Sequence, residues 1–105
     1  MQRFLLPVVI GVLCGCVGRG KPNFFAEDPV LRVAAIKEVS QHNDQSQLAR
    51  LIDRLEDEAE EVRLYAVLAL RQMTGQQFGF RAHGLPWHRE EAVEQWRRWA
   101  RSRRR

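Results

Sequence analysis

The chain has 105 residues, of which 17 are Lys or Arg and 13 are Asp or Glu, giving a formal net charge of +4. Apolar residues make up 45% and charged residues 29%, a composition typical of a folded domain and not of a disordered chain. A chain of this size buries only about 60 to 65% of its unfolded surface, which leaves little room for both a core and a deep catalytic cleft. The composition excludes a multidomain enzyme and favours a small binding or structural module.

The amino terminus has the pattern of an export signal. Arg3 supplies a positive charge, residues 4–13 contain no polar side chain, and small residues precede Cys16. The apolar run is shorter than the roughly 20 residues that span a bilayer and contains Pro7 and Gly11, so a transmembrane helix is the weaker interpretation. The other alternative is a short buried helix with inert thiols, but charge, length and cysteine position together favour export.

The two cysteines lie one residue apart, so they cannot join distant parts of a fold, and a disulfide between them would be strained. Leu13, Gly15 and Cys16 resemble the lipobox of bacterial lipoprotein signal peptides, although Cys14 replaces the usual Ala, Ser or Thr. This resemblance implies removal of residues 1–15 and attachment of a diacylglycerol and an acyl chain such as palmitate to Cys16. It places the protein on the outer side of the cytoplasmic membrane or in the outer membrane.

Residues 16–27 are predicted to form a lipidated flexible tether. Gly18, Gly20 and Pro22, together with two basic residues, make a regular element unfavourable in this stretch. The ordered part of the chain is expected to begin near Asp28.

The middle of the chain repeats itself with a period of 31 residues. Residues 31–36 (Leu-Arg-Val-Ala-Ala-Ile) align with residues 62–67 (Val-Arg-Leu-Tyr-Ala-Val), and Val39 aligns with Leu70. Periods of about 20 to 50 residues are typical of solenoids, in which each unit buries its apolar face against the next. Because the apolar spacing within each copy is helical, the sequence predicts an all-α fold of about two helical hairpins.

Apolar positions mark three helices in this region. Asp28 and Pro29 are predicted to begin the first, as a capping carboxylate and a proline that needs no backbone donor. Leu64, Val67 and Leu68 make the third helix apolar on a further side, so it is expected to lie between neighbours. The predicted buried faces are Leu48, Leu51, Ile52 and Leu55 on the second helix and Val62, Tyr65, Ala66, Ala69, Leu70 and Met73 on the third.

Residues 28–74 resemble short HEAT-like repeats, helical hairpins found in bacterial repeat proteins. The first copy carries the family's aspartate, arginine and paired alanines, and the second keeps Arg63, Ala66 and Leu70 but has Glu60 where proline is common. The resemblance implies a short α-solenoid that works through shape and surface, without a shared active site.

Residues 75–88 are predicted to form a loop rich in glycine and aromatic residues. Phe78, Phe80 and Trp87 are expected to fold back over the helices. The alternative is an exposed Phe78-Gly79-Phe80 segment that anchors a partner.

Residues 89–105 are predicted to form a basic, tryptophan-rich capping helix and tail. Ala92, Val93, Trp96 and Ala100 share one helical stripe, with Trp99 at its margin. The stripe is expected to cover the apolar side that the last repeat helix leaves open. The segment therefore closes the short solenoid.

The charges of this last segment exceed what the fold requires. Glu90 and Glu91 are expected in the first helical turn, and Glu94 lies four residues before Arg98, within reach of an ion pair. Seven arginines and three glutamates give residues 89–105 a net charge of +4, so phosphate-bearing or acidic partners are favoured. The candidate partner-binding residues are Arg97, Arg98, Arg101, Arg103, Arg104 and Arg105.

The sequence offers no constellation for catalysis or metal binding. His42, His83 and His88 have no HExxH or CxxC spacing, and no serine lies on a strand-to-helix elbow. We therefore expect a non-enzymatic protein without a metal, a cofactor or a small-molecule substrate.

A cluster of acidic residues lies around the turn before the third helix. It is interpreted as a solvated turn with capping carboxylates, with weak cation binding as the alternative. It comprises Asp53, Glu56, Asp57, Glu58, Glu60 and Glu61.

The sequence thus predicts a bacterial envelope lipoprotein, anchored in the membrane through Cys16, that presents a HEAT-like scaffold to another envelope protein. The terminal arginines are interpreted as a second membrane contact beside the anchor, a site for an acidic partner, or a solubilising tail. The alternative is a cytoplasmic nucleic-acid-binding helical module that uses the same arginines on phosphates. Nucleic acid is the least accessible partner for an exported chain.

Overall fold

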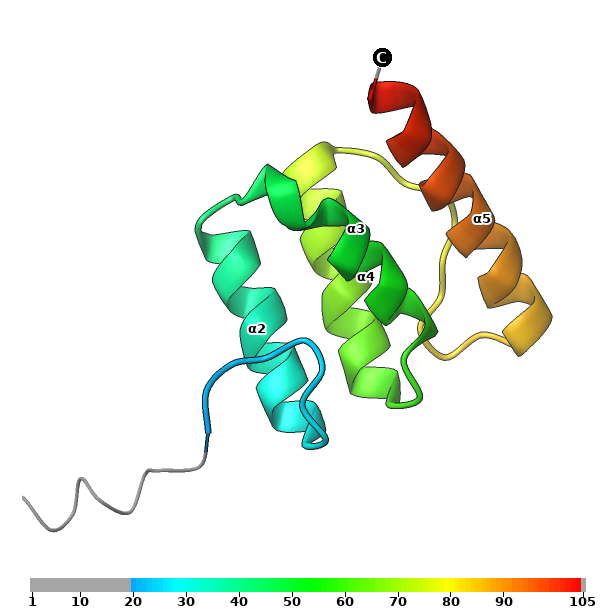
Figure 1. The fold of residues 1–105 in the computed structure, drawn as a ribbon. Coiled ribbons are helices and arrows are strands. Elements are labelled where there is room, and N and C mark those ends of the chain that lie inside the picture. The colour runs from blue at the N-terminus through cyan, green and yellow to red at the C-terminus, as the bar shows by residue number, and fades with distance from the viewer. Residues whose placement is uncertain (1–19, 105) are drawn as a thin grey trace, which may run out of the picture.

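The structure is a computed structural model that describes residues 20–104, and over this range the chain is all-α without strands (Figure 1). The predicted signal peptide of residues 1–15, the predicted lipidation site Cys16 and the terminal Arg105 lie outside the described residues. None of the helices within residues 20–104 combines the length and the apolar character that crossing a membrane requires. The elements are α2 (Pro29–Gln41), the 3₁₀-helix η2 (Gln45–Gln47), α3 (Leu48–Asp53), the 3₁₀-helix η3 (Arg54–Glu56), α4 (Glu60–Thr74) and α5 (Pro86–Arg103).

The helices form two layers. α2 packs beside α4, and α3 packs on α4 and on α5, while η3 also contacts α4 and α5. In Figure 1, α2 and α4 lie side by side and run in the same direction, and α3, which lies between them in the sequence, runs in the opposite direction against α4. This arrangement is consistent with a short α-solenoid.

The second repeat departs from the predicted hairpin. After Gly75 ends α4 in the left-handed conformation, at φ 75°, the chain continues without helix up to Leu85. It returns along α4, since Arg71 near the end of this helix donates to the carbonyl of Phe80 and Arg63 near its beginning donates to that of Ala82. Figure 1 shows that α5 consequently runs in nearly the same direction as α4. An extended segment therefore takes the place of the second repeat's returning helix.

α2 begins as the sequence predicts. The Asp28 carboxylate accepts a hydrogen bond of 2.9 Å from the backbone N–H of Val30, and Pro29 is the first helical residue. The helix ends at Gln41, and Asn43 follows with a positive φ of 49°. This cap and this end define the helix that carries Arg32, the arginine that the repeat aligns with Arg63.

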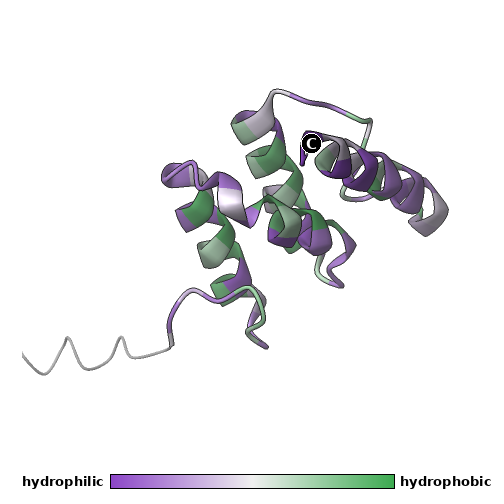
Figure 2. Cartoon of the chain, turned by 45° about the horizontal axis from the view of Figure 1, so that its top comes forward, coloured by the Kyte–Doolittle hydropathy of each residue, from purple (hydrophilic) through white to green (hydrophobic). Residues whose placement is uncertain are grey.

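The predicted apolar faces of the second and third helices are mostly confirmed. On α3 and η3 the whole predicted face is buried. On α4 Tyr65 and Met73 are only partly buried, and Leu64 and Leu68 are 44% and 46% exposed. Of the three residues that form the second apolar side of α4, Leu64, Val67 and Leu68, only Val67 is therefore buried, at 2% exposure. In Figure 2, α4 carries long hydrophobic stretches, whereas α5 is mostly hydrophilic.

The chain is packed well before Asp28, where the ordered part was expected to begin. Phe24 is buried, and the backbone N–H of Asn23 donates to the carbonyl of Leu31 over 3.2 Å. Residues 20–27, which we name the entry segment, contain no helix or strand, as their composition predicts. They are nevertheless held on the helices, because an irregular segment can dock through one aromatic side chain and its backbone carbonyls.

The aromatic residues after α4 divide into two groups. Phe80 is buried at 2% exposure, and Phe78 packs edge to face on Trp96 with 4.8 Å between ring centroids. Trp87 is 61% exposed, so its prediction as a covering residue is wrong. The reason is that α5 begins at Pro86, which places Trp87 in the first helical turn and leaves Glu90 and Glu91 beyond it.

The predicted buried stripe of α5 is confirmed, but its partner differs from the expectation. Ala92, Val93 and Trp96 are buried, and Ala100 is partly buried against the core. α5 packs mainly on α3 and η3, while the extended segment runs along α4. Trp96 therefore closes the domain together with Phe78 and not by covering α4 alone.

Candidate functional site

Two arginines that the 31-residue repeat aligns make equivalent contacts. Nη1 of Arg32 donates to the carbonyls of Ala26 and Glu27, at 2.6 and 3.0 Å. Nη1 of Arg63 donates to the carbonyls of Asp57 and Glu58, at 2.8 and 3.2 Å. In both cases the acceptors lie six and five positions upstream, and both arginines are buried. The repeat seen in the sequence is thus also a repeat of hydrogen bonds.

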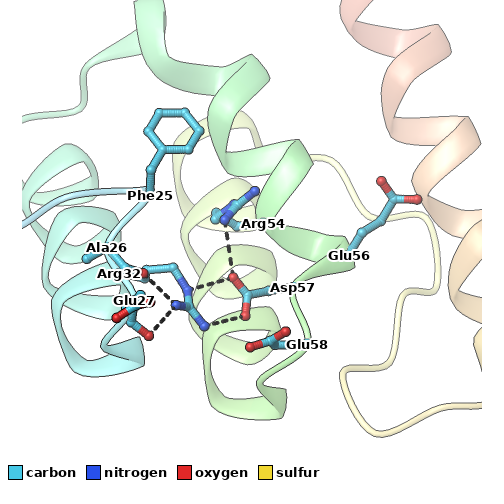
Figure 3. A pocket seen from close by; sticks show the side chains of 8 residues that line it. All are labelled: Phe25, Ala26, Glu27, Arg32, Arg54, Glu56, Asp57 and Glu58. Atoms are coloured by element: carbon cyan, nitrogen blue, oxygen red, sulfur yellow. Dashed lines mark hydrogen bonds and ion pairs between the residues drawn. The ribbon is translucent and has the colours of Figure 1, made fainter.

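Asp57 is the hydrogen-bonding centre of this part of the fold (Figure 3). Its Oδ2 accepts from Nε of Arg32 at 2.9 Å and from Nη1 of Arg54 at 3.3 Å. Its Oδ1 accepts from Nη2 of Arg32 and from the backbone N–H of Ala59, both at 2.9 Å. The interpretation of Asp57 as part of a solvated turn is wrong, because its side chain is only 3% exposed. A buried carboxylate is retained when several donors pair with it, as they do here.

The hollow beside Asp57, of about 430 Å³, lies between the entry segment and η3 (Figure 3). The donors that face it are already used within the fold, since Arg54 also donates to the carbonyl of Phe24 at 3.1 Å. Exposed carboxylates of Glu27, Glu56 and Glu58 line its rim and disfavour an anionic ligand. The arginines that line the hollow hold the entry segment on the repeats through its carbonyls, so we do not regard the hollow as a ligand site.

A second candidate site lies where α3 begins and α5 ends. Two adjoining hollows of about 240 and 260 Å³ are both lined by Ala49, Ala100 and Arg104. Because alanine side chains are short, the two helices leave unfilled space between them at this end. We name this feature the α3–α5 groove. Its other lining residues are Gln45, Ser46, Leu48, Ile52, Asp53, Arg97, Trp99, Arg101 and Arg103.

The predicted partner-binding arginines divide between the groove and its surroundings. Arg97, Arg101, Arg103 and Arg104 line the groove, whereas Arg98 is exposed elsewhere on α5. Arg105 lies outside the described residues. The predicted arginine cluster is therefore brought together only in part.

Arg97, which was predicted to bind a partner, forms ion pairs within the protein. Its Nη2 lies 2.8 Å from a carboxylate oxygen of Glu56 and 3.3 Å from one of Asp53. The hydrogen bond to Glu56 raises the pKa of Arg97 above its usual value, because it stabilises the charged guanidinium more than partial burial disfavours it. Arg97 thus links α5 to α3 and η3 and is less available to a partner.

The remaining arginines at this end are held more loosely. Arg101 lies 3.4 Å from Glu94, so the predicted pair of Glu94 with Arg98 does not form. The guanidinium of Arg103 stacks over the ring of Trp99 at 4.8 Å from its centroid. Among the described residues, Arg98 and Arg104 form no ion pair. Positive charge therefore remains available at the carboxy-terminal end of α5.

The three histidines lie apart. His42 and His83 are exposed, and His88 is half-buried at the beginning of α5. No group of three or more side chains suited to hold a metal ion occurs among residues 20–104.

Sequence reasoning located the arginines but not the groove that they border. Ala49 lies on the exposed side of α3, and Trp99 was expected only at the margin of an apolar stripe. The only feature of the sequence that could have indicated the groove was the occurrence of small residues and a tryptophan near several arginines.

No family model matches the chain, and comparison with curated proteins and with solved structures finds no significant match.

Proposed function

We propose that this protein is a non-enzymatic envelope lipoprotein, anchored through acylated Cys16, that presents a short HEAT-like helical scaffold to another envelope protein. The HEAT-like assignment is supported by the 31-residue repeat and by the matching contacts of Arg32 and Arg63. The anchor is supported by the lipobox pattern that ends at Cys16.

The observation that carries the binding role is the α3–α5 groove. It combines an apolar floor at Ala49 and Ala100 with positive charge on Arg103 and Arg104, and the contacts of the fold do not consume that charge. Small repeat proteins act through such surfaces, because stacked helices present a preformed face at little entropic cost. The groove is therefore the surface that we assign to the partner.

The test of this function begins with the anchor. Intact mass of the protein from a bacterial host should show loss of residues 1–15 and added acyl chains, and the protein should sediment with membranes. Cys16→Ser should abolish both, whereas Cys14→Ser should preserve both as the matched control. An unprocessed chain that stays in the cytosolic fraction would refute the proposal and favour a nucleic-acid-binding module.

The binding role requires a second experiment. Crosslinking in intact cells, followed by purification from the envelope, should capture a protein partner with the unaltered chain. Ala49→Trp, which fills the groove from an exposed position, should reduce this capture. Leu64→Trp, which adds the same ring at an exposed position on α4, should leave it unchanged. Equal capture by both variants would exclude the groove as the binding surface.

A further inference from the structure

We infer that the α3–α5 groove binds an acidic amphipathic segment of a protein, with carboxylates on Arg103 and Arg104 and an apolar side chain between Ala49 and Ala100. This inference rests on the proposed function and specifies the chemistry of the partner at the same site. It follows from the charge, the floor and the surroundings of the groove.

The charge of the groove favours a carboxylate ligand. Within residues 20–104, Asp53 is the one acidic residue that lines the two hollows, and its side chain pairs with Arg97. Arg103 is held over Trp99, which restricts the motion of its guanidinium while leaving its side chain exposed. Arg104 is exposed and has no ion-pair partner among the described residues. Planar guanidinium groups of this kind form paired hydrogen bonds with carboxylates.

The floor of the groove requires an apolar contribution from the ligand. Ala49 and Ala100 form this floor, Leu48 and Ile52 are buried beneath it, and Trp99 borders it. A purely ionic ligand would leave this apolar surface in water, whereas an amphipathic segment would cover it. A helix or short peptide with apolar residues on one face and carboxylates beside them satisfies both parts of the surface.

The surroundings disfavour a nucleic acid. Glu90, Glu91 and Glu94 occupy exposed positions on the same helix, so the basic surface is limited to its carboxy-terminal end. A nucleic acid backbone requires cations along its path and is repelled by carboxylates beside them. Arg97 and Arg101 also face carboxylates of this chain, which lowers the positive charge that a second phosphate would meet.

The binding experiment uses the full chain as isolated from its host, in neutral detergent. The probe is a synthetic helical peptide of Glu, Leu and Ala with one apolar face. A peptide with Lys in place of Glu serves as the ligand control. Trp99 borders the groove, so its fluorescence should report binding, and Trp99→Phe should remove that signal. Binding should weaken as salt increases.

Two matched double variants locate the site. Arg103→Glu with Arg104→Glu should weaken peptide binding by about tenfold or more, because both contacts become repulsive. Lys21→Glu with Arg81→Glu changes the net charge equally at exposed positions outside the groove and should alter binding by less than about twofold. Circular dichroism and thermal melting establish that both variants fold.

Three outcomes would overturn the inference. Equal loss in both double variants would show that the net charge acts without a site. Equal binding of the Lys peptide would remove the charge requirement. Stronger binding to anionic phosphatidylglycerol vesicles or to single-stranded nucleic acid than to the acidic peptide would assign the arginines to those ligands. Each outcome is independent of Cys16 processing, so the inference fails separately from the proposed anchor.

Discussion

The guanidinium of Arg32 and the carboxylate of Asp57 meet in two parallel hydrogen bonds, from Nε to Oδ2 and from Nη2 to Oδ1, each 2.9 Å long. Arg32 lies on α2, and Asp57 lies in the turn that precedes α4. The pair therefore joins the two copies of the repeat at a buried position. The same guanidinium also holds the entry segment through the carbonyls of Ala26 and Glu27.

Asp57→Ala should destabilise the fold strongly. Removing this carboxylate leaves Arg32 buried without its charged partner, and such losses cost about 3 to 5 kcal/mol. Thermal and urea unfolding should show the effect as a large decrease in the free energy of unfolding. Glu58→Ala is the matched control, because its neighbouring side chain is exposed, and it should change stability by less than about 0.5 kcal/mol. Similar midpoints for both variants would show that the buried pair is not important for stability.

Leu51→Ala and Leu70→Ala should each cost about 2 to 5 kcal/mol, since both side chains are fully buried in the core. Leu64→Ala, at a position that is 44% exposed on α4, should cost much less. Urea unfolding monitored by circular dichroism distinguishes these cases. The predicted core would be wrong if all three substitutions lowered the midpoint equally.

Truncation after Gln95 should unfold or aggregate the domain. Trp96 is completely buried and packs on Phe78, so its removal exposes the apolar surface beneath α5. Size-exclusion chromatography and circular dichroism measure the outcome. Trp87→Ala should leave both measurements unchanged, because Trp87 is 61% exposed. A truncated chain that stays folded and monomeric would make α5 an appendage of the domain.

Arg97→Gln should reduce stability by no more than about 1 kcal/mol, because its partners Asp53 and Glu56 are exposed to solvent and salt. A double-mutant cycle with Glu56→Gln isolates the coupling between the two side chains. The coupling should decrease at high salt. A coupling that does not change between low and high salt would contradict the assignment of this contact as a surface ion pair.

Helix periodicity was the most informative signal in the sequence. The spacing of Leu48, Leu51, Ile52 and Leu55 identified a buried face, and Asp28 identified the start of α2. A buried helical face and a helix start can both be recognised from residues that are close together in the sequence. The glycine and aromatic residues after α4 also predicted the loop that the structure shows over residues 75–85, although it was expected to extend to residue 88. The sequence did not show that this loop returns along α4 in place of a second returning helix.

The error at Trp87 has a local cause, since α5 begins at Pro86, whereas two other errors concern contacts between residues that are distant in sequence. Asp57 belongs to a run of acidic residues, and its burial depends on Arg32, which lies 25 positions earlier. Arg97 was assigned to a partner because the carboxylates that engage it lie more than 40 positions earlier. The arginines of the groove were found from composition, whereas its floor depends on how α3 meets α5. Local patterns therefore predicted the elements, and tertiary packing determined which charges remain available.

Besides the buried side chain of Phe24, the main chain holds the entry segment, because Arg32 and Arg54 bind the carbonyls of Phe24, Ala26 and Glu27. A mechanical load applied from the amino-terminal side would reach these bonds before it reached the hydrogen bonds of α2. The bonds from Arg32 to the consecutive carbonyls of Ala26 and Glu27 would share that load. The entry segment would therefore act as a mechanical clamp that protects α2 from unfolding under force. Since every residue carries a carbonyl, the clamp would tolerate changes of side chain at positions 26 and 27, but it would not tolerate loss of either arginine.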